Sequence, residues 1–302
     1  MTLTDEILKL KREKKAVILA HNYQRPEIQD IADYVGDSIE LSKRAKEERD
    51  ARIILFSAVD FMAESAAILN PNKKVLLPSQ GARCPMAQML RVEEVRRWKR
   101  KYPKVPVLLY VNTLAEVKAE CDICCTSANA VKVVNSLDSG TLLFGPDYNL
   151  ALYVQRKTNK EVIAMPEKGF CPTHVLFQKD DILFLKREHP DAVVIVHPEC
   201  TPEVQEIADY IGSTSQMCRY ARDLPARKFI IGTERGLIHR LKKENPAKDF
   251  IIAYEGAICP NMKLNTLERI YLALKEEKYP VNVPAPIAKK ARKALEEMFA
   301  IT

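Results

Sequence analysis

The chain has 302 residues, of which 47% are hydrophobic, enough for one large domain or two to three small ones. Its 47 Lys and Arg residues only slightly outnumber its 40 Asp and Glu residues, and the interleaving of the two signs argues against a nucleic-acid-binding face. The net charge of +7 suits small anionic substrates, and without a visible signal peptide or membrane-spanning apolar run we expect a cytoplasmic protein with no membrane partner.

The first part of the chain predicts helices that alternate with short strands. A charged amphipathic helix at 5–15 precedes the apolar strand AVILA, which ends at His21. A helical stretch leads to Ser38, a second strand ends near Asp60, and a third, KVLL, is soon followed by Cys84. Strands of this kind between helices are typical of a parallel sheet covered on both faces.

The same pattern occurs three times. The segments PEIQDIADYVGDS, at 26–38, and PEVQEIADYIGST, at 202–214, share eight of thirteen residues. A less similar copy between them keeps the same spacing from the strand-end residue to the hydroxyl residue. The matching positions are the strand ends His21, Tyr110 and His197, the hydroxyl residues Ser38, Ser127 and Thr214, the acidic residues Asp60, Asp147 and Glu234, and the cysteines Cys84, Cys171 and Cys259.

This internal repeat predicts the fold and the domain organisation. We expect an α/β protein of three pseudo-threefold-related α/β/α units, Rossmann-like and each with a parallel sheet, around a central active site. The predicted units are residues 1–87, 88–175 and 176–262, and a C-terminal helical tail, 263–302, is expected to pack on the first unit.

The repeated polar residues indicate where the site lies. In open parallel sheets, ligands bind outside the carboxyl ends of the strands, and the strand-end residues and cysteines all follow strands. A pseudo-threefold axis would bring the equivalent positions together. The hydroxyl residues precede expected helix starts, whose free N–H groups favour carboxylates and phosphates. They could equally be plain helix caps.

The three cysteines in register are candidate metal ligands. Structural zinc sites usually have closely spaced pairs of ligands, whereas these thiols are one per unit. Thiolates favour iron–sulfur clusters, and three protein ligands would leave one iron open as a Lewis acid. Although a lone free cysteine is often a core residue, Cys84, Cys171 and Cys259 each lie in a polar loop. Their place in polar loops favours a role as metal ligands over a role as core residues.

The other five cysteines carry weaker signals. Cys121, Cys124 and Cys125 form CDICC, whose CxxC could be a redox pair or a metal site, although core thiols are the favoured interpretation. Cys200 is a candidate for the pocket wall, and Cys218 has no predicted role.

The motifs resemble those of the quinolinate synthases. They are HNYQ at 21–24, GDS at 36–38, YVN at 110–112, TSAN at 126–129, GFCPTH at 169–174, HPEC at 197–200 and GSTSQM at 212–217, with the loops around Cys84 and Cys259. The resemblance runs through all three units, at about residues 5–265. It implies a transferase-type enzyme that condenses iminosuccinate with dihydroxyacetone phosphate to quinolinate, phosphate and water in NAD biosynthesis. It also implies one 4Fe–4S cluster per chain and, as a possible partner, the enzyme that supplies iminosuccinate.

The resemblance also implies roles for individual residues. The cluster ligands would be Cys84, Cys171 and Cys259. Glu199 is the candidate general acid/base, with Tyr23 and His174 as further proton-transferring or positioning groups. The expected substrate contacts are His21, Ser38, Tyr110, Val111, Asn112, Ser127, His197, Pro198, Glu199 and Thr214.

Two other kinds of protein fit part of this pattern. Hydro-lyases of the aconitase kind, the diphthamide-forming enzymes and the hydroxymethylbutenyl diphosphate reductases also leave one iron of a cluster open. The set HNYQ, HPEC and GSTS favours quinolinate synthase over them. An iron–sulfur sensor or electron carrier would be expected to have four cysteine ligands and would not need a pocket of His, Tyr, Ser and Glu.

Overall fold

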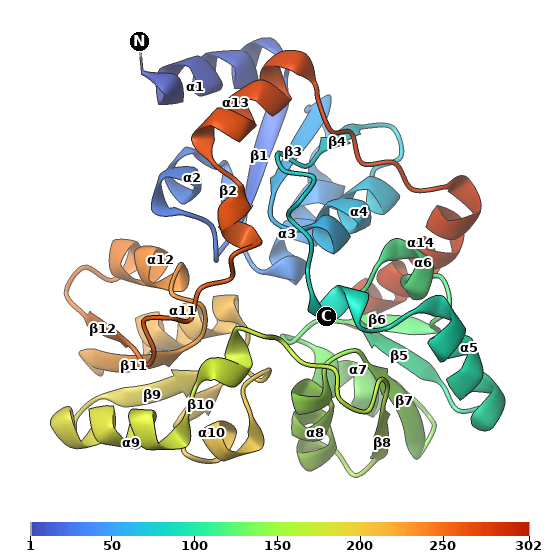
Figure 1. Cartoon of the computed structure of the whole chain (residues 1–302), viewed down its shortest axis with the longest axis vertical. Helices are drawn as coiled ribbons and strands as arrows, with labels where there is room; N and C mark the ends of the chain where they lie inside the picture. The colour runs from blue at the N-terminus through green and yellow to red at the C-terminus, as the bar shows by residue number, and fades with distance from the viewer. Residues whose placement is uncertain (1, 302) are drawn as a thin grey trace.

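The computed structural model describes residues 2–301 and contains three four-stranded parallel sheets. Helices flank each sheet, and the three α/β units surround a common centre (Figure 1). The sheet orders are β2-β1-β3-β4, β6-β5-β7-β8 and β10-β9-β11-β12, so all three units have the same topology. This confirms the fold predicted from the repeat.

The elements of the three units follow one plan. Unit 1 contains α1 (Leu3–Glu13), β1 (Ala16–His21), α2 (Pro26–Ile31), β2 (Tyr34–Gly36), α3 (Ser38–Glu47), β3 (Ile53–Ser57), α4 (Asp60–Leu69) and β4 (Lys74–Leu76). Unit 2 contains α5 (Val92–Lys101), β5 (Val107–Tyr110), α6 (Ala115–Lys118), β6 (Ile123–Cys125), α7 (Ala130–Ser136), β7 (Thr141–Gly145), α8 (Tyr148–Lys157) and β8 (Glu161–Ala164). Unit 3 contains α9 (Lys179–Glu188), β9 (Val193–Val196), α10 (Pro202–Glu206), β10 (Tyr210–Ile211), α11 (Thr214–Asp223), β11 (Lys228–Gly232), α12 (Leu237–Glu244) and β12 (Asp249–Ile252).

An aspartate repeats at the start of the second strand of each unit and ties it to the first. The carboxylates of Asp33, Asp122 and Asp209 each accept a hydrogen bond, at 2.8 Å, from a backbone N–H of β1, β5 and β9 respectively. A bond in this place satisfies a strand amide that the ladder leaves open. The three units therefore share side-chain interactions as well as topology.

The C-terminal segment divides between two places. Helix α13 (Leu267–Glu276) packs against α1 and β3 in unit 1. Helix α14 (Ala285–Ala300) packs mainly against β6 and α6 of unit 2, and also against α4 of unit 1. Figure 1 shows α13 on the N-terminal unit and α14 near the junction of units 1 and 2.

Hydrophobic packing joins units 1 and 2 to each other more closely than it joins either of them to unit 3. One buried cluster contains side chains of β1, β3, α4, β5, β7 and α14, whereas unit 3 has separate cores of its own. Polar bonds connect unit 3 to unit 1, such as Ser213 Oγ to Asp37 Oδ2 at 2.8 Å and Asn22 Nδ2 to Thr214 Oγ1 at 2.8 Å.

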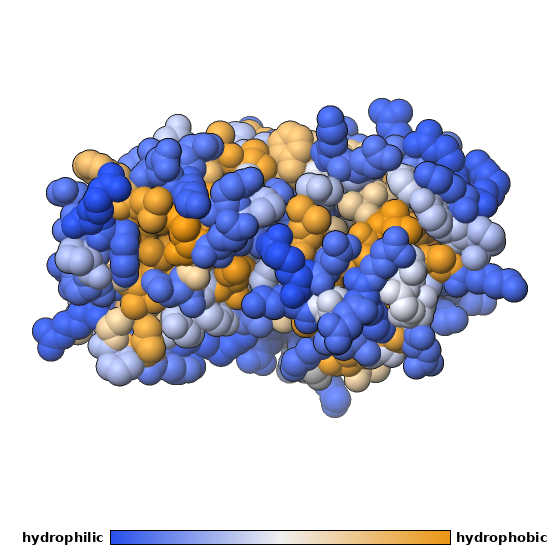
Figure 2. Space-filling model, turned by 90° about the horizontal axis from the view of Figure 1, so that it is seen from below, coloured by the Kyte–Doolittle hydropathy of each residue, from blue (hydrophilic) through white to orange (hydrophobic). Residues whose placement is uncertain are grey.

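The face in Figure 2 is largely hydrophilic, with smaller apolar areas between the polar side chains. This matches the interleaved charges of the sequence. Among residues 2–301, no helix combines the length and the apolar character needed to cross a bilayer.

Candidate active site

A cavity lies where the carboxyl ends of the strands from all three units meet. Its polar lining residues are His21, Tyr23, Asp37, Ser38, Tyr110, Asn112, Thr126, Ser127, Thr173, His174, His197, Glu199 and Thr214, together with Cys84, Cys171 and Cys259. Every unit contributes to this lining. The structure thus brings together the residues that the repeat placed at equivalent positions.

The three cysteines occupy matching loops. Each follows the last strand of its unit and precedes a single 3-10 turn, at Met86–Gln88, His174–Leu176 and Met262–Leu264. All three side chains are partly buried and line the cavity. Burial, then the nearby Glu199 and Cys84, raise the pKa of the Cys171 thiol.

His21 and His197 have the same tautomer for the same local reason. The backbone N–H of Tyr23 donates to His21 Nδ1 at 3.1 Å, and that of Glu199 donates to His197 Nδ1 at 3.2 Å. A ring nitrogen that accepts a hydrogen bond carries no proton, so each ring is protonated at Nε2. Burial lowers the pKa of both histidines to about 3. Both are therefore neutral N–H donors in the cavity wall.

Glu199 lies beside two histidines at the end of β9. Its Oε2 is 2.7 Å from His174 Nδ1 and 3.8 Å from His197 Nδ1, and its exposed fraction is 3%. Burial opposes the charge on this carboxyl, but hydrogen bonds from His174 and Tyr110 hold the pKa of Glu199 below its usual range. The residue is an ionised base at neutral pH.

The hydroxyl of Thr233 connects Tyr23 with His174, which in turn contacts Glu199. The Tyr23 hydroxyl is 2.6 Å from Thr233 Oγ1, which is 2.9 Å from His174 Nε2. The Tyr23 hydroxyl also lies 3.3 Å from the same ring nitrogen. Sequence reasoning missed Thr233, although it directly precedes the repeated acidic residue Glu234. The four side chains form one path along which a proton can move.

The repeated hydroxyl residues line the cavity but are not the helix caps. Ser38 and Thr214 are the first residues of α3 and α11, whose caps are Asp37 and Ser213. Ser127 lies in the turn before α7. Ser38 and Thr214 thus leave the capping of α3 and α11 to their neighbours, and the Thr214 hydroxyl, which accepts from Asn22, still has its own proton to donate.

Two expected contact residues lie outside the cavity lining. Tyr110 and Asn112 line the cavity, whereas Val111 between them packs in the hydrophobic core. Pro198 lies likewise between His197 and Glu199, and its carbonyl accepts a hydrogen bond from Gln205. Alternate residues of an extended segment point to opposite sides, which explains both cases. The Asn112 side-chain oxygen is buried and has no hydrogen-bond partner within residues 2–301.

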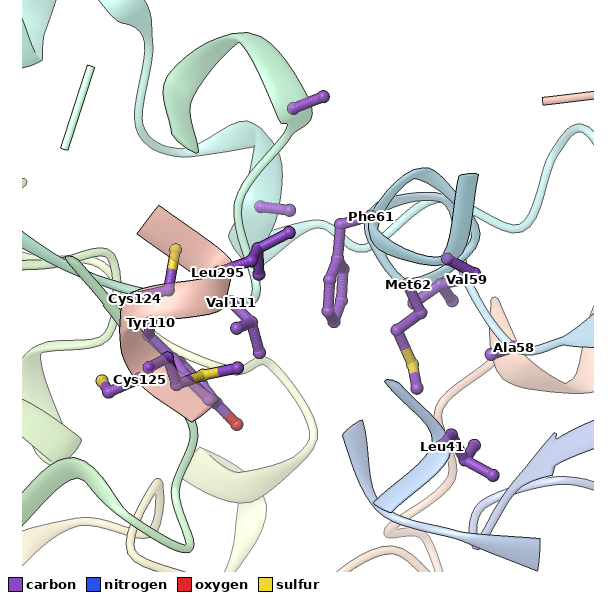
Figure 3. Packing of buried hydrophobic residues seen from close by; sticks show 14 of the residues in the cluster. Leu41, Ala58, Val59, Phe61, Met62, Tyr110, Val111, Cys124, Cys125 and Leu295 are labelled. Atoms are coloured by element: carbon purple, nitrogen blue, oxygen red, sulfur yellow. The ribbon is translucent and has the colours of Figure 1, made fainter. Parts of the chain in front are cut away.

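The sequence did not indicate the apolar part of the wall. It consists of Val59, Phe61, Met62, Met86 and Met262. Figure 3 shows Phe61 and Met62 extending from α4, with Val111 and Tyr110 on the other side of Phe61. Helix-periodic apolar residues look alike in sequence whether they face a core or a cavity, so no pattern distinguished these side chains.

The remaining cysteines lie in or beside the hydrophobic cores. Cys124 and Cys125 are buried, and Cys121 Sγ lies 3.8 Å from Cys124 Sγ. Cys200 is not part of the cavity wall, because its thiol faces the Gly232 carbonyl at 3.4 Å. Cys218 is buried within unit 3.

One group in the cavity has atoms close enough to hold a single metal ion. The ligand atoms of Cys171, His174 and Glu199 all lie within 4.8 Å of one another. The cavity thus contains three thiols from three different loops, together with the possible ligands His174 and Glu199.

Comparison with known proteins gives one consistent result. A family model described as "Quinolinate synthetase A protein" matches residues 5–300. Similar curated proteins, named quinolinate synthase, come from Alkaliphilus metalliredigens (53% identical, covering 99% of this chain and 98% of the relative), Pyrococcus horikoshii (53%, 100% of both) and Thermotoga maritima (51%, 99% of both).

Proposed function

This chain belongs to the quinolinate synthetase A protein family, and from that premise we propose that it condenses iminosuccinate with dihydroxyacetone phosphate, releasing phosphate and water. Its activity is the synthesis of quinolinate in NAD biosynthesis. The observation that best supports the proposed substrates is the cavity itself, where neutral donors, hydroxyls and an ionised base from three units face one another.

The donor set of the cavity fits a 4Fe–4S cluster held by Cys84, Cys171 and Cys259. Three thiols from three equivalent loops line one cavity, and thiolates are the usual ligands of such clusters. When bound, the cluster would supply an iron with an open position that acts as a Lewis acid. The closer group of Cys171, His174 and Glu199 could instead hold a single zinc ion. However, that would occupy Glu199 and break its contact with His174.

The wall of the cavity suits two small anions. The Nε2–H groups of His21 and His197 can donate to carboxylate oxygens without carrying charge. Ser38, Ser127 and Thr214 add hydroxyls near helix starts, where free N–H groups favour phosphate and carboxylate. The unpartnered oxygen of Asn112 can accept from a hydroxyl or imine N–H. These groups would orient both substrates and exclude water.

Glu199 is the proposed general acid/base. Formation of the pyridine ring joins two molecules and removes water, so protons must move at several carbons and oxygens. The ionised carboxylate takes up a proton, and the path through His174 and Thr233 to Tyr23 can pass it on. Tyr23 and His174 would thus transfer protons or position the base.

An anaerobic assay tests the proposal. Protein purified without oxygen and reconstituted with iron and sulfide should show the broad visible absorbance of an iron–sulfur cluster and form quinolinate from the two proposed substrates. Zinc-loaded protein with equal activity and no visible absorbance would refute the cluster. An absorbing protein that forms no quinolinate from these substrates would instead fit a sensor or carrier. We also expect the protein in the cytoplasm, beside the enzyme that supplies iminosuccinate.

A further inference from the structure

An acidic residue follows the third strand of each unit in chain order, β3, β7 and β11, and its carboxylate faces the cysteine loop of the same unit. Asp60 Oδ1 accepts a hydrogen bond from the backbone N–H of Cys84 at 3.0 Å, and Glu234 Oε1 accepts one from the N–H of Cys259 at 3.1 Å. In the second unit, the Cys171 N–H lies near Asp147, whose Oδ1 accepts its 2.7 Å hydrogen bond from the backbone N–H of Leu150. The carboxylate therefore faces the cysteine loop in all three units and bonds directly to the cysteine amide in units 1 and 3.

A second hydrogen bond runs back from each helix start to the same loop. The backbone N–H of Asp60 donates to the Ala82 carbonyl at 2.8 Å. The N–H of Tyr148, beside Asp147, donates to Gly169 at 2.7 Å, and that of Arg235, beside Glu234, donates to Ala257 at 3.0 Å. The accepting carbonyl always lies two residues before the cysteine. Each loop is therefore held on both sides by the residues at one helix start.

In units 1 and 3 the carboxylate also holds the far side of the loop. Gln88 and Lys263 each follow their cysteine by four residues. Gln88 is the last residue of its 3-10 turn, and Lys263 is the middle residue of the corresponding turn in unit 3. Gln88 Nε2 donates to Asp60 Oδ2 at 3.1 Å, and Lys263 Nζ lies 2.9 Å from Glu234 Oε1. Asp147 has no such partner, and its Oδ2 is buried without a hydrogen bond among the residues that the structure describes.

We propose that Asp60, Asp147 and Glu234 are positioning residues for the cluster, which fix the three cysteine loops, and that Asp60 and Glu234 hold a negative charge behind the thiolates of Cys84 and Cys259. This inference rests on the proposed cofactor. Groups that hold a metal ligand in place through hydrogen bonds usually contribute strongly to metal affinity. A negative charge near an iron–sulfur cluster opposes its reduction, which suits a cluster that acts as a Lewis acid and keeps one oxidation state.

A matched control is present in the same chain. Asp122 accepts a backbone hydrogen bond at 2.8 Å, as Asp60 does, but its donor is Val107 at the start of β5, away from the cysteine loops. Loss of either bond should lower the melting temperature of the apoprotein. Only loss of the Asp60 bond should affect the cluster.

The first measurement is the rate at which a chelator removes iron from anaerobically reconstituted protein. We expect Asp60→Ala and Glu234→Ala to release iron at least about tenfold faster than the wild type. Asp60→Asn and Glu234→Gln, which keep an oxygen acceptor, should stay close to the wild-type rate, and so should Asp122→Ala. Wild-type release rates in both alanine variants, or equally fast release from Asp122→Ala, would overturn the positioning role.

The second measurement uses the amide variants, which test the charge even if the alanine variants fail to fold. The midpoint potential of the cluster should rise in Asp60→Asn and Glu234→Gln and stay unchanged in Asp122→Asn. Unchanged potentials in both amide variants would refute the electrostatic part. Wild-type protein that holds no four-iron cluster would overturn the proposed cofactor and this inference with it, so the two failures are distinguishable.

Discussion

At the scale of single residues, Glu199 is where the electrostatics of the cavity converge. Its carboxylate contacts His174 and His197 and helps to set the properties of both tyrosines, because its charge raises the pKa of Tyr23 and Tyr110 in addition to burial. A change at this position should therefore affect proton transfer more than binding.

We expect Glu199→Gln to keep the cluster and to lose at least about a hundredfold in turnover, the usual scale for a general acid/base. Glutamine keeps the size and hydrogen-bonding capacity but cannot take up a proton. Steady-state quinolinate formation on reconstituted protein measures the effect. His197→Ala is the comparison, because it should act mainly through KM. Near-normal turnover of Glu199→Gln would move the acid/base role to Tyr23 or His174.

Thr233→Val should test the path between Tyr23 and His174. The valine keeps the shape of threonine but removes the hydroxyl that lies 2.6 Å from one and 2.9 Å from the other. If protons pass along this path, kcat should fall about tenfold or more while iron content and KM stay the same. Thr158→Val removes a hydroxyl bonded to the Val154 carbonyl on α8 and should leave kcat unchanged. Equal kcat for both variants would show that the path is not used.

The two neutral histidines make stability depend on pH in a defined direction. Burial lowers the pKa of His21 and His197 to about 3 in the folded state, from 6.5 when unfolded. Between these values the unfolded chain binds more protons, so stability falls as the pH falls below 6.5. From pH 7 to pH 5 the loss should be about 2 kcal/mol per histidine.

Urea unfolding of the apoprotein at the two pH values checks this dependence. In His21→Asn/His197→Asn the other titrating groups remain, so the difference between the two proteins isolates the histidines. Equal losses in the wild type and the double variant would mean that the two rings are not held neutral.

At the scale of elements, α14 is the helix whose place depends on two units. It lies against β6 and α6 of unit 2 and α4 of unit 1, and Leu295 on its inner face is fully buried beside Cys124 (Figure 3). Strand β6 leads directly to the turn that carries Ser127. The last helix therefore supports one wall of the cavity from behind.

Leu295→Ala should lower the free energy of unfolding by about 2 to 5 kcal/mol, because it leaves a cavity between the two units. Leu272→Ala on α13 is the matched control, since that leucine is 43% exposed and its loss should cost less than about 0.5 kcal/mol. Chemical denaturation of the two apoproteins measures both. If the two substitutions cost the same, α14 does not stabilise the junction of units 1 and 2.

At the scale of the whole molecule, the site exists only when all three units are assembled. Each unit contributes one cysteine and one of the repeated hydroxyl residues Ser38, Ser127 and Thr214 to the cavity. Units 1 and 2 share a hydrophobic core, whereas unit 3 has its own and joins unit 1 through polar bonds.

Replacing any one of Cys84, Cys171 and Cys259 by alanine should therefore abolish the cluster absorbance and the activity. Cys121→Ala, Cys124→Ala and Cys125→Ala should keep both, because these thiols lie in or beside the core of unit 2. Iron content and the visible spectrum of the six variants distinguish the two groups. A full four-iron complement in any of the first three would contradict the ligand assignment.

The sequence by itself determined the fold, the family and the set of polar residues that meet at the centre. A repeat of strands and helices folds locally in the same way each time, and equivalent positions of equivalent units converge on a common axis. Cys84, Cys171 and Cys259 could therefore be grouped although they lie far apart in the chain. The domain boundaries and residue roles stay predictions.

The tertiary structure decided what breaks the repeat. Thr233 joins Tyr23 to His174, residues from three different units, and its two equivalents by position are Val59 and Pro146, which have no hydroxyl. Val111 and Pro198 lie outside the cavity lining because side chains alternate between the two sides of the extended backbone at each strand end. Helix α14 lies mainly on unit 2, where it packs against β6 and α6 and buries Ala291, Ala294, Leu295 and Met298. Such contacts depend on packing between distant segments, and no local pattern in the chain encodes them.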